Sequence, residues 1–201
     1  LIPVNQDYTI NINALSQAIE EDRRGGYKPI CVIGNAGTIN TGAIDDLNAI
    51  ADLCEKENLW FHVDGAIGAI AMLSEKVRPL LSGIERADSV ALDLHKWMHV
   101  PFEAGCILLK NNEDHRNTFS LTPEYLAHET RGLPGGHLWF SDYGIQLSRE
   151  FRALKVWMSV KEHGLKRFGR MIERNIEQAN YFADLVKKDS DMELVAPVGL
   201  D

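Results

Sequence analysis

The chain has 201 residues, of which 45% are hydrophobic and 25% charged, so it has enough apolar material for a globular core. Its formal net charge of −8 argues against the basic surface that binds nucleic acids or anionic membranes. The first residues lack the basic start and apolar core of a signal peptide, and no apolar run approaches the ~18 residues of a membrane span, so we expect a cytoplasmic protein.

The first 110 residues alternate between two kinds of apolar pattern. Apolar side chains three and four residues apart predict helices, and short β-branched runs without alternation predict strands covered on both faces. Strands joined by helices or long crossovers form a mainly parallel sheet, so we expect an α/β domain. The predicted elements are a helix at 11–24, a strand at 29–34, a helix that begins at Asp45 or Asp46, and strands at 59–64, 89–94 and 105–110.

After these strands the sequence predicts a long loop and then two helices. Residues 111–148 are rich in Asn, Thr, Pro, Gly, His and Glu and show no clear period, which is typical of a loop with short pieces of structure. Helical spacing returns over 147–163 and 165–188, and Gly164 separates the two helices. The apolar run at 192–197 predicts the start of another strand.

The three cysteines are Cys31, Cys54 and Cys106, which are widely spaced, odd in number and set in apolar runs. This pattern predicts buried thiols in a reducing compartment and no disulfide framework. The chain also begins without methionine and stops just after an apolar run, so we expect a segment of a longer protein.

Two neighbouring strands are expected to end in residues that carry chemistry. One strand ends in Asp64, which the small residues Gly65 and Ala66 follow. The next strand runs into His95 and Lys96. Because the carboxyl ends of parallel strands line the crevice where ligands bind, we expect both ends to face one site. A lysine there needs a partner, since removing an ammonium group from water is costly.

Three kinds of site are compatible with these residues. Asp64 and Lys96 could form a structural ion pair. Lys96 could instead anchor pyridoxal phosphate, whose aldehyde needs an amine and whose pyridine nitrogen needs a carboxylate such as Asp64. We favour this second interpretation over a metal site, because the lysine would repel a cation, and we take His62 as a core histidine that donates to a backbone carbonyl. The candidate metal ligands would be His62, Asp64, Asp93 and His95.

Several stretches resemble a known family. GTINTGAIDDL, WFHVDGA and ADSVALDLHKW, in this order and spacing, look like the group II pyridoxal-phosphate-dependent amino-acid decarboxylases, which include aromatic-amino-acid, histidine and glutamate decarboxylases. The resemblance continues through FSLTPEYL and LSREFRALKVW. It implies the α/β fold of aspartate aminotransferase, called fold type I. Residues 1–160 would be part of the large cofactor-binding domain, and 161–201 would lead into a small C-terminal domain.

The resemblance also implies roles for individual residues. Lys96 would form the internal aldimine with pyridoxal 5'-phosphate, and Asp64 would bind the pyridine nitrogen. Ala66 would pack on one face of the ring, and His95 would lie close to the cofactor near its phosphate. Tyr125 would deliver a proton to the substrate carbon after carbon dioxide leaves.

Two positions depart from the family's usual pattern. Ile39 follows Thr38 where relatives have a second hydroxyl, so Thr38 alone is expected to contact the cofactor. Asp93 stands where relatives often have asparagine or another neutral residue close to the phosphate. Because a carboxylate beside a phosphate is unfavourable, we expect Asp93 to turn away or to be bridged by another group.

The implied reaction is decarboxylation of an L-amino acid to its amine by a homodimer, without a nucleic-acid or membrane partner. The same anchors would also serve transamination or oxidative deamination with aldehyde formation. A non-catalytic homologue would keep the same fold. The sequence does not identify the amino acid.

Overall fold

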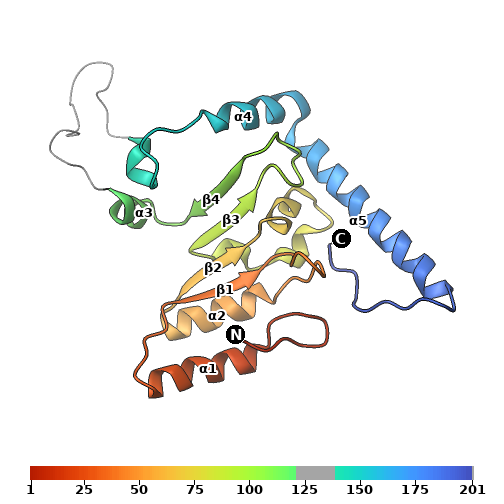
Figure 1. The fold of residues 1–201 in the computed structure, drawn as a ribbon, viewed down its shortest axis with the longest axis horizontal. Helices are drawn as coiled ribbons and strands as arrows, with labels where there is room; N and C mark the ends of the chain where they lie inside the picture. Colours follow the sequence, from red (N-terminus) through yellow and green to blue (C-terminus); the bar gives the residue numbers. More distant parts are fainter. Residues whose placement is uncertain (121–138, 201) are drawn as a thin grey trace. The chain divides into compact units, whose positions relative to one another are not determined.

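The computed structural model describes residues 1–120 and 139–200. They belong to two compact units, a larger one of Leu1–Leu108 with Arg152–Asp201 and a smaller one of Leu109–Phe151. The larger unit contains the sheet and most of the helices (Figure 1). In the described residues, no helix is long and apolar enough to cross a membrane.

A four-stranded sheet forms the centre of the larger unit, and its strands follow one another in chain order. β1 pairs with β2 and β2 with β3, both in parallel, so three carboxyl ends meet at one edge of the sheet. Asp64 is in register with Asn35 on one side and with Ala91 on the other. The mainly parallel α/β architecture is therefore confirmed. The strands are β1 (Cys31–Asn35), β2 (Trp60–Asp64), β3 (Ser89–Asp93) and β4 (Gly105–Leu109).

α2 (Leu47–Glu57) lies against one face of this sheet, and α1 (Ile12–Arg24) lies next to α2 (Figure 1). α2 packs on β1 and β2, and α1 packs on α2. Each begins at a capping side chain that accepts a backbone N–H, Asn11 for α1 and Asp46 for α2. Both predicted helices are confirmed. Their apolar faces and the inner faces of the strands form the core, which includes Leu15, Ile19, Val32, Leu47, Ile50, Phe61 and Val63.

The opposite face of the first two strands is open, so the prediction of strands covered on both faces is wrong for the described residues. Burial alternates along β1, and Ile33 is 56% exposed. The physical reason is that α1 and α2 lie on one face only. The prediction of buried cysteines holds for Cys54, whereas Cys31 on the open face is exposed and Cys106 is half-buried.

The connection from β2 to β3 consists of three 3-10 helices, against which the last long helix packs. α5 (Leu165–Lys188) contacts the first of them, and Ser74 Oγ donates to Glu173 of α5 at 2.7 Å. α5 follows the predicted boundaries. The 3-10 helices are η1 (Gly68–Leu73), η2 (Arg78–Leu81) and η3 (Ile84–Arg86).

The elements after residue 110 differ more from the prediction. α4 (Arg152–His163) begins five residues after the expected start, because the chain before it is irregular and Arg149 donates to the Phe140 carbonyl at 2.9 Å. In the smaller unit, the predicted loop contains a helix, α3 (Asn112–Phe119), and a 3-10 turn, η5 (Phe140–Tyr143).

The segment after α5 is not a strand, so the prediction at 192–197 is wrong. A strand needs a neighbouring strand to satisfy its backbone groups, and this segment pairs with no strand of the described sheet. Three residues beyond this range, Leu200 is fully buried and packs against Gly37 and Gly68.

Candidate active site at the carboxyl edge of the sheet

Asp64 ends β2 with its side chain exposed at the carboxyl edge. Its Oδ1 accepts the Ala66 N–H at 3.1 Å, which turns the chain away from the sheet. A Cβ at Gly65 would lie 2.5 Å from Ala69 Cβ, so the chain's own packing requires this glycine. Within the described residues Asp64 has no ion-pair partner. Its Oδ2 is therefore open to a ligand.

Lys96 lies in the turn that follows β3, and its amine contacts Asp93, the last residue of that strand. Lys96 Nζ is 2.9 Å from Asp93 Oδ2, and the Lys96 N–H donates to the Asp93 carbonyl at 3.1 Å. The Lys96 side chain is 37% exposed. The alternative of an ion pair between Asp64 and Lys96 is therefore wrong. Asp93 pairs with Lys96 in this structure, and its expected position relative to a phosphate stays a prediction.

His95 is fixed by the same turn. Its Nδ1 accepts the Ala104 N–H at 3.0 Å, so the neutral ring carries its proton on Nε2. Nε2 lies 3.8 Å from Asp93 Oδ2, which is beyond hydrogen-bond distance. Phe102 packs edge-on against the ring, with the two ring centres 4.8 Å apart. His95 therefore presents an N–H towards the carboxylate that holds Lys96.

Thr38 lies in the loop after β1, where its hydroxyl already has two partners. Its Oγ1 accepts the Ala43 N–H at 3.1 Å and lies 2.7 Å from Thr41 Oγ1. When Thr41 donates in this pair, both acceptor positions of Thr38 are used and its own proton is available for an outside acceptor. Ile39, which follows, is 79% exposed.

Asp45 was expected to serve the helix start and instead joins two backbone segments. It is buried, with 4% of its surface exposed, and it accepts the Ile10 N–H at 2.6 Å and the Asn35 N–H at 2.7 Å. The cap of α2 is the next residue, Asp46. Asp45 thus holds the end of β1 and the start of the Thr38 loop in place.

His62 has a different partner from the one expected. Its Nδ1 lies 2.7 Å from Ser89 Oγ, and Trp60 Nε1 donates to the same hydroxyl oxygen at 2.8 Å. Ser89 is thus the partner of the His62 ring nitrogen, and the expected bond to a backbone carbonyl is wrong. The described residues contain no group of three His, Cys, Asp or Glu side chains that could hold a metal ion.

Two contacts around Lys96 were missed in the sequence. The pair of Asp93 and Lys96 has the i,i+3 spacing of a turn, so the stretch DLHK could have indicated it. Glu103, in the chain that follows Lys96, forms an ion pair with Arg152 at the start of α4. These two residues are 49 positions apart, and no local pattern relates them. The pair connects the segment after Lys96 to α4.

The groups at this edge fit pyridoxal phosphate by their chemistry. A partly exposed amine, an open carboxylate and a hydroxyl that can donate when Thr41 donates to it are the partners for an aldehyde, a basic ring nitrogen and a ring oxygen. Lys96, Asp64 and Thr38 supply them from the turn after β3, the end of β2 and the loop after β1. Tyr125, the expected proton donor, lies outside the described residues.

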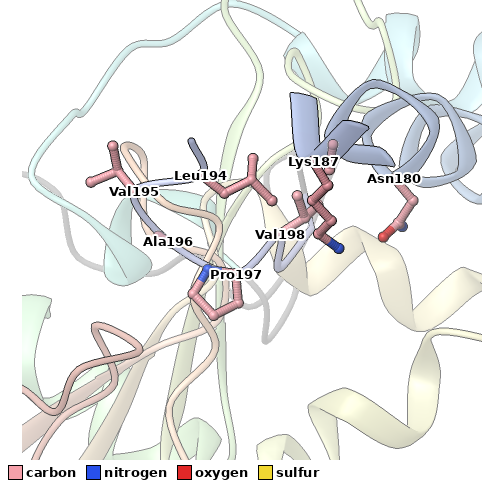
Figure 2. A pocket seen from close by; sticks show the side chains of 8 residues that line it. Asn180, Lys187, Leu194, Val195, Ala196, Pro197 and Val198 are labelled. Carbon is pink, nitrogen blue, oxygen red and sulfur yellow. The ribbon is translucent and has the colours of Figure 1, made fainter. Parts of the chain in front are cut away.

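Two cavities of the larger unit are formed by other residues. One, of about 530 Å³, lies between α5 and the segment after it, and Figure 2 shows Asn180 and Lys187 facing residues 194–198. The other, of about 600 Å³, has His99 and Pro101 on one side and residues of α4 on the other. No predicted site residue lines either cavity, so the candidate site is defined by the sheet edge.

Comparisons with known proteins identify the family of the chain. Residues 1–201 match the model of the pyridoxal-dependent decarboxylase conserved domain. The chain is 45% identical over 199 residues to an aromatic-L-amino-acid decarboxylase of Bacillus atrophaeus, and the match covers 99% of the chain and 41% of that protein. It is 35% identical over 203 residues to a 3,4-dihydroxyphenylacetaldehyde synthase of Drosophila melanogaster, covering all of the chain and 39% of that protein.

The fold is also found in solved structures. The crystal structure of Oryza sativa TDC with PLP and tryptamine matches with a TM-score of 0.90 and 29% identity, over 98% of this chain and 40% of that one. The chain thus spans about two fifths of the length of these relatives.

Proposed function

The chain belongs to the pyridoxal-dependent decarboxylase family, and from this premise we propose that the full-length protein decarboxylates an L-amino acid to its amine with pyridoxal 5'-phosphate. The observation that carries the proposal is the separation of two groups at one sheet edge. The Asp64 carboxylate is open, and the partly exposed Lys96 amine pairs with Asp93 and not with Asp64. Asp64 is therefore left for a ligand, and the exposed ion pair of Lys96 is weak enough to open.

Each site residue has a proposed task. When bound, pyridoxal 5'-phosphate supplies an aldehyde that links to amines and a pyridine ring that accepts the electron pair left by carbon dioxide. Lys96 would hold this group covalently, and Asp64 would accept the hydrogen bond of the protonated ring nitrogen. Ala66, whose N–H already fixes Asp64, would offer a small surface for the ring. His95 would lie near the phosphate, and Thr38 would donate its free hydroxyl proton.

Two further tasks concern protons and product release. Tyr125 would return a proton to the carbon that has lost its carboxylate, which completes the amine. Lys96 would then take back its covalent link and release the amine. Both tasks remain predictions from the resemblance.

A second candidate function is aldehyde formation, supported by the 35% identity to the Drosophila melanogaster synthase. The two reactions differ in the fate of the carbon that has lost carbon dioxide. Protonation by Tyr125 gives an amine, whereas interception by oxygen gives an aldehyde and ammonia. In the full-length protein, Tyr125→Phe should still release carbon dioxide, while under air the amine yield falls and aldehyde appears. Unchanged amine yield under air would exclude Tyr125 as the proton donor.

We further propose a cytoplasmic homodimer in which residues 1–160 belong to the large domain and 161–201 lead to the small one. The three cysteines, all free, support a reducing compartment. The exposed apolar side chains of α4, among them Trp157 and Met158, offer surface for a partner subunit. Sedimentation of the full-length protein at several concentrations tests the dimer.

The decisive experiment measures carbon dioxide release from a panel of L-amino acids by the full-length protein. A decarboxylase gives carbon dioxide and amine in equal amounts, and an aldehyde synthase gives carbon dioxide with aldehyde, ammonia and oxygen uptake. Borohydride reduction followed by peptide mapping should place a pyridoxyl group on Lys96. A label on Lys110 or Lys155 instead would contradict the assignment, and absence of turnover with every substrate would favour a non-catalytic homologue.

A further inference from the structure

Asp93 faces two nitrogen groups of its own turn. Lys96 Nζ lies 2.9 Å from Asp93 Oδ2, and His95 Nε2 lies 3.8 Å from the same oxygen. The first distance is a direct contact, and the second is less than 1 Å longer. Because the Ala104 N–H occupies His95 Nδ1, the proton of the neutral ring is on the nitrogen that faces Asp93.

The contact matters because of how a lysine reacts with an aldehyde. An ammonium group held by a carboxylate has no lone pair to offer, so Lys96 must lose one proton to solvent and leave Asp93. The neutral nitrogen then bonds to the aldehyde carbon. The aldehyde oxygen leaves as water together with the two remaining amine hydrogens. Asp93 has lost its partner at the end of this step.

We propose that Asp93 is a positioning residue that keeps Lys96 in a resting, unreactive contact and exchanges it for the His95 Nε2–H when Lys96 reacts. The inference rests on the proposed function, in which the aldehyde belongs to the cofactor. The exchange leaves the Asp93 carboxylate with a hydrogen-bond donor after Lys96 has moved away, so it is not left without a partner. The side chains of Lys96 and Asp93 are 37% and 26% exposed, so the resting contact is weak enough to be reversed.

The resting contact can be tested without any turnover. The full-length protein, freed of cofactor, is trace-labelled with acetic anhydride, and the digest gives labelling of Lys96 relative to the exposed Lys110. Asp93→Asn should raise this ratio about two- to fivefold, the range of a partly exposed ion pair. Asp93→Glu, which retains the carboxylate, should stay closer to the wild type. Roughly 1 M salt should raise the ratio in the wild type but not in Asp93→Asn.

A matched control comes from α5. Asp184 and Lys187 have the same i,i+3 spacing, with 3.8 Å between Oδ1 and Nζ. Asp184→Asn should leave the labelling ratio of Lys96 unchanged. The proposal is overturned if Asp93→Asn leaves that ratio at the wild-type value.

The exchange is tested by the rate at which Lys96 links to an aldehyde, followed by absorbance. Pyridoxal, which lacks the phosphate, should react with Asp93→Asn about two- to fivefold faster than with the wild type near neutral pH. His95→Asn, which keeps an acceptor for Ala104 but has no Nε2–H, should react more slowly. Acceleration with pyridoxal phosphate but not with pyridoxal would mean that Asp93 acts on the phosphate, and it would overturn the proposal.

A failure of the proposed function can be distinguished from a failure of this inference. If the proposed function is wrong, Lys96 forms no covalent link with pyridoxal or pyridoxal phosphate. The acetylation ratio of Lys96 still shows whether Asp93 restrains the amine.

Discussion

β2 and β3 end side by side in aspartate, but within residues 1–120 and 139–200 only Asp93 of the two has a charged partner. Asp64 is in register with Ala91, two positions before Asp93. The turn after Asp64 brings back only a backbone N–H, that of Ala66, at 3.1 Å. The turn after Asp93 brings back the Lys96 amine at 2.9 Å. The difference therefore arises from the residues that follow each strand, not from the strands.

This difference separates two uses of a carboxylate. A carboxylate without a counter-charge in the described chain is suited to a cation from outside, such as a protonated ring nitrogen. A carboxylate that holds its own lysine controls where that lysine lies. The comparison predicts unequal effects for changes at the two strand ends.

The largest effect on turnover is expected when the Lys96 amine is replaced by another cationic group. Lys96→Arg retains a cation for Asp93, so the free energy of unfolding should stay within about 1 kcal/mol of the wild type. Turnover of the full-length protein should fall about 10³-fold or more, because a guanidinium cannot form the covalent link. Assays of product formation and urea unfolding measure the two quantities. A loss of stability equal to the loss of activity would show that the variant is merely unfolded.

The next effect compares the two aspartates directly. Asp64→Asn should lower kcat about 100-fold, because the ring nitrogen loses its charge partner. Asp93→Asn removes a positioning contact and should lower kcat less than tenfold. Both substitutions preserve side-chain size, so each is the control for the other. Equal losses in the two variants would contradict the division between the two strand ends.

A buried thiol of α2, that of Cys54, sets the pH range for this comparison. Burial, with smaller contributions from Cys31 and Asp88, raises the pKa of Cys54 to about 11 from an ordinary value of 9.0. The unfolded chain loses this proton first, so the contribution to stability is complete below about pH 9 and is lost as the pH rises to about 11. Two pKa units correspond to about 3 kcal/mol at most.

Urea unfolding of the wild type and Cys54→Ala between these pH values tests the assignment. The wild type should lose stability as the pH rises, and Cys54→Ala should have a shallower slope because it lacks the thiol. Parallel slopes would assign the loss to other groups. Activities of the aspartate variants should accordingly be compared below about pH 9.

The smallest effect concerns the turn that carries Lys96. Ala104 is 2% exposed, so its N–H loses its only side-chain acceptor in His95→Ala and remains buried. The expected loss is about 1–2 kcal/mol in the free energy of unfolding. His95→Asn, which offers an oxygen near the position of Nδ1, should recover most of it. If both variants lose the same amount, packing of the ring on Phe102 and not the hydrogen bond stabilises the turn.

Local signals in the sequence were sufficient to locate several elements. The spacing of apolar residues and the caps Asn11 and Asp46 located α1 and α2 within a few residues, because helix periodicity and capping depend on neighbours in the chain. Asp64, which ends β2, and Lys96, which follows β3, were recognised because each comes at or just after the end of an apolar, strand-like run. Parallel pairing then required that both lie at one edge.

The spacing of apolar residues was less reliable for identifying which side chains of α5 are buried. On α5 the large apolar Phe182 is 66% exposed, whereas the smaller Ala183 is buried. The buried positions Phe168, Ile172 and Ala183 follow steps of three and four residues along one stripe, which passes through Ala183 and not through Phe182.

The contacts between distant groups depended on the three-dimensional arrangement of the chain. Residues 192–197 have a strand-like composition, but a strand forms only where another strand completes its hydrogen bonds, and none of the described strands does so. Likewise, Asp93 and Asp64 are equivalent as residue types beside Lys96. The hydrogen bond from Ala104 to His95 fixes the turn that carries Lys96. In this turn the backbone places Asp93 within reach of the flexible lysine side chain, so the amine contacts Asp93.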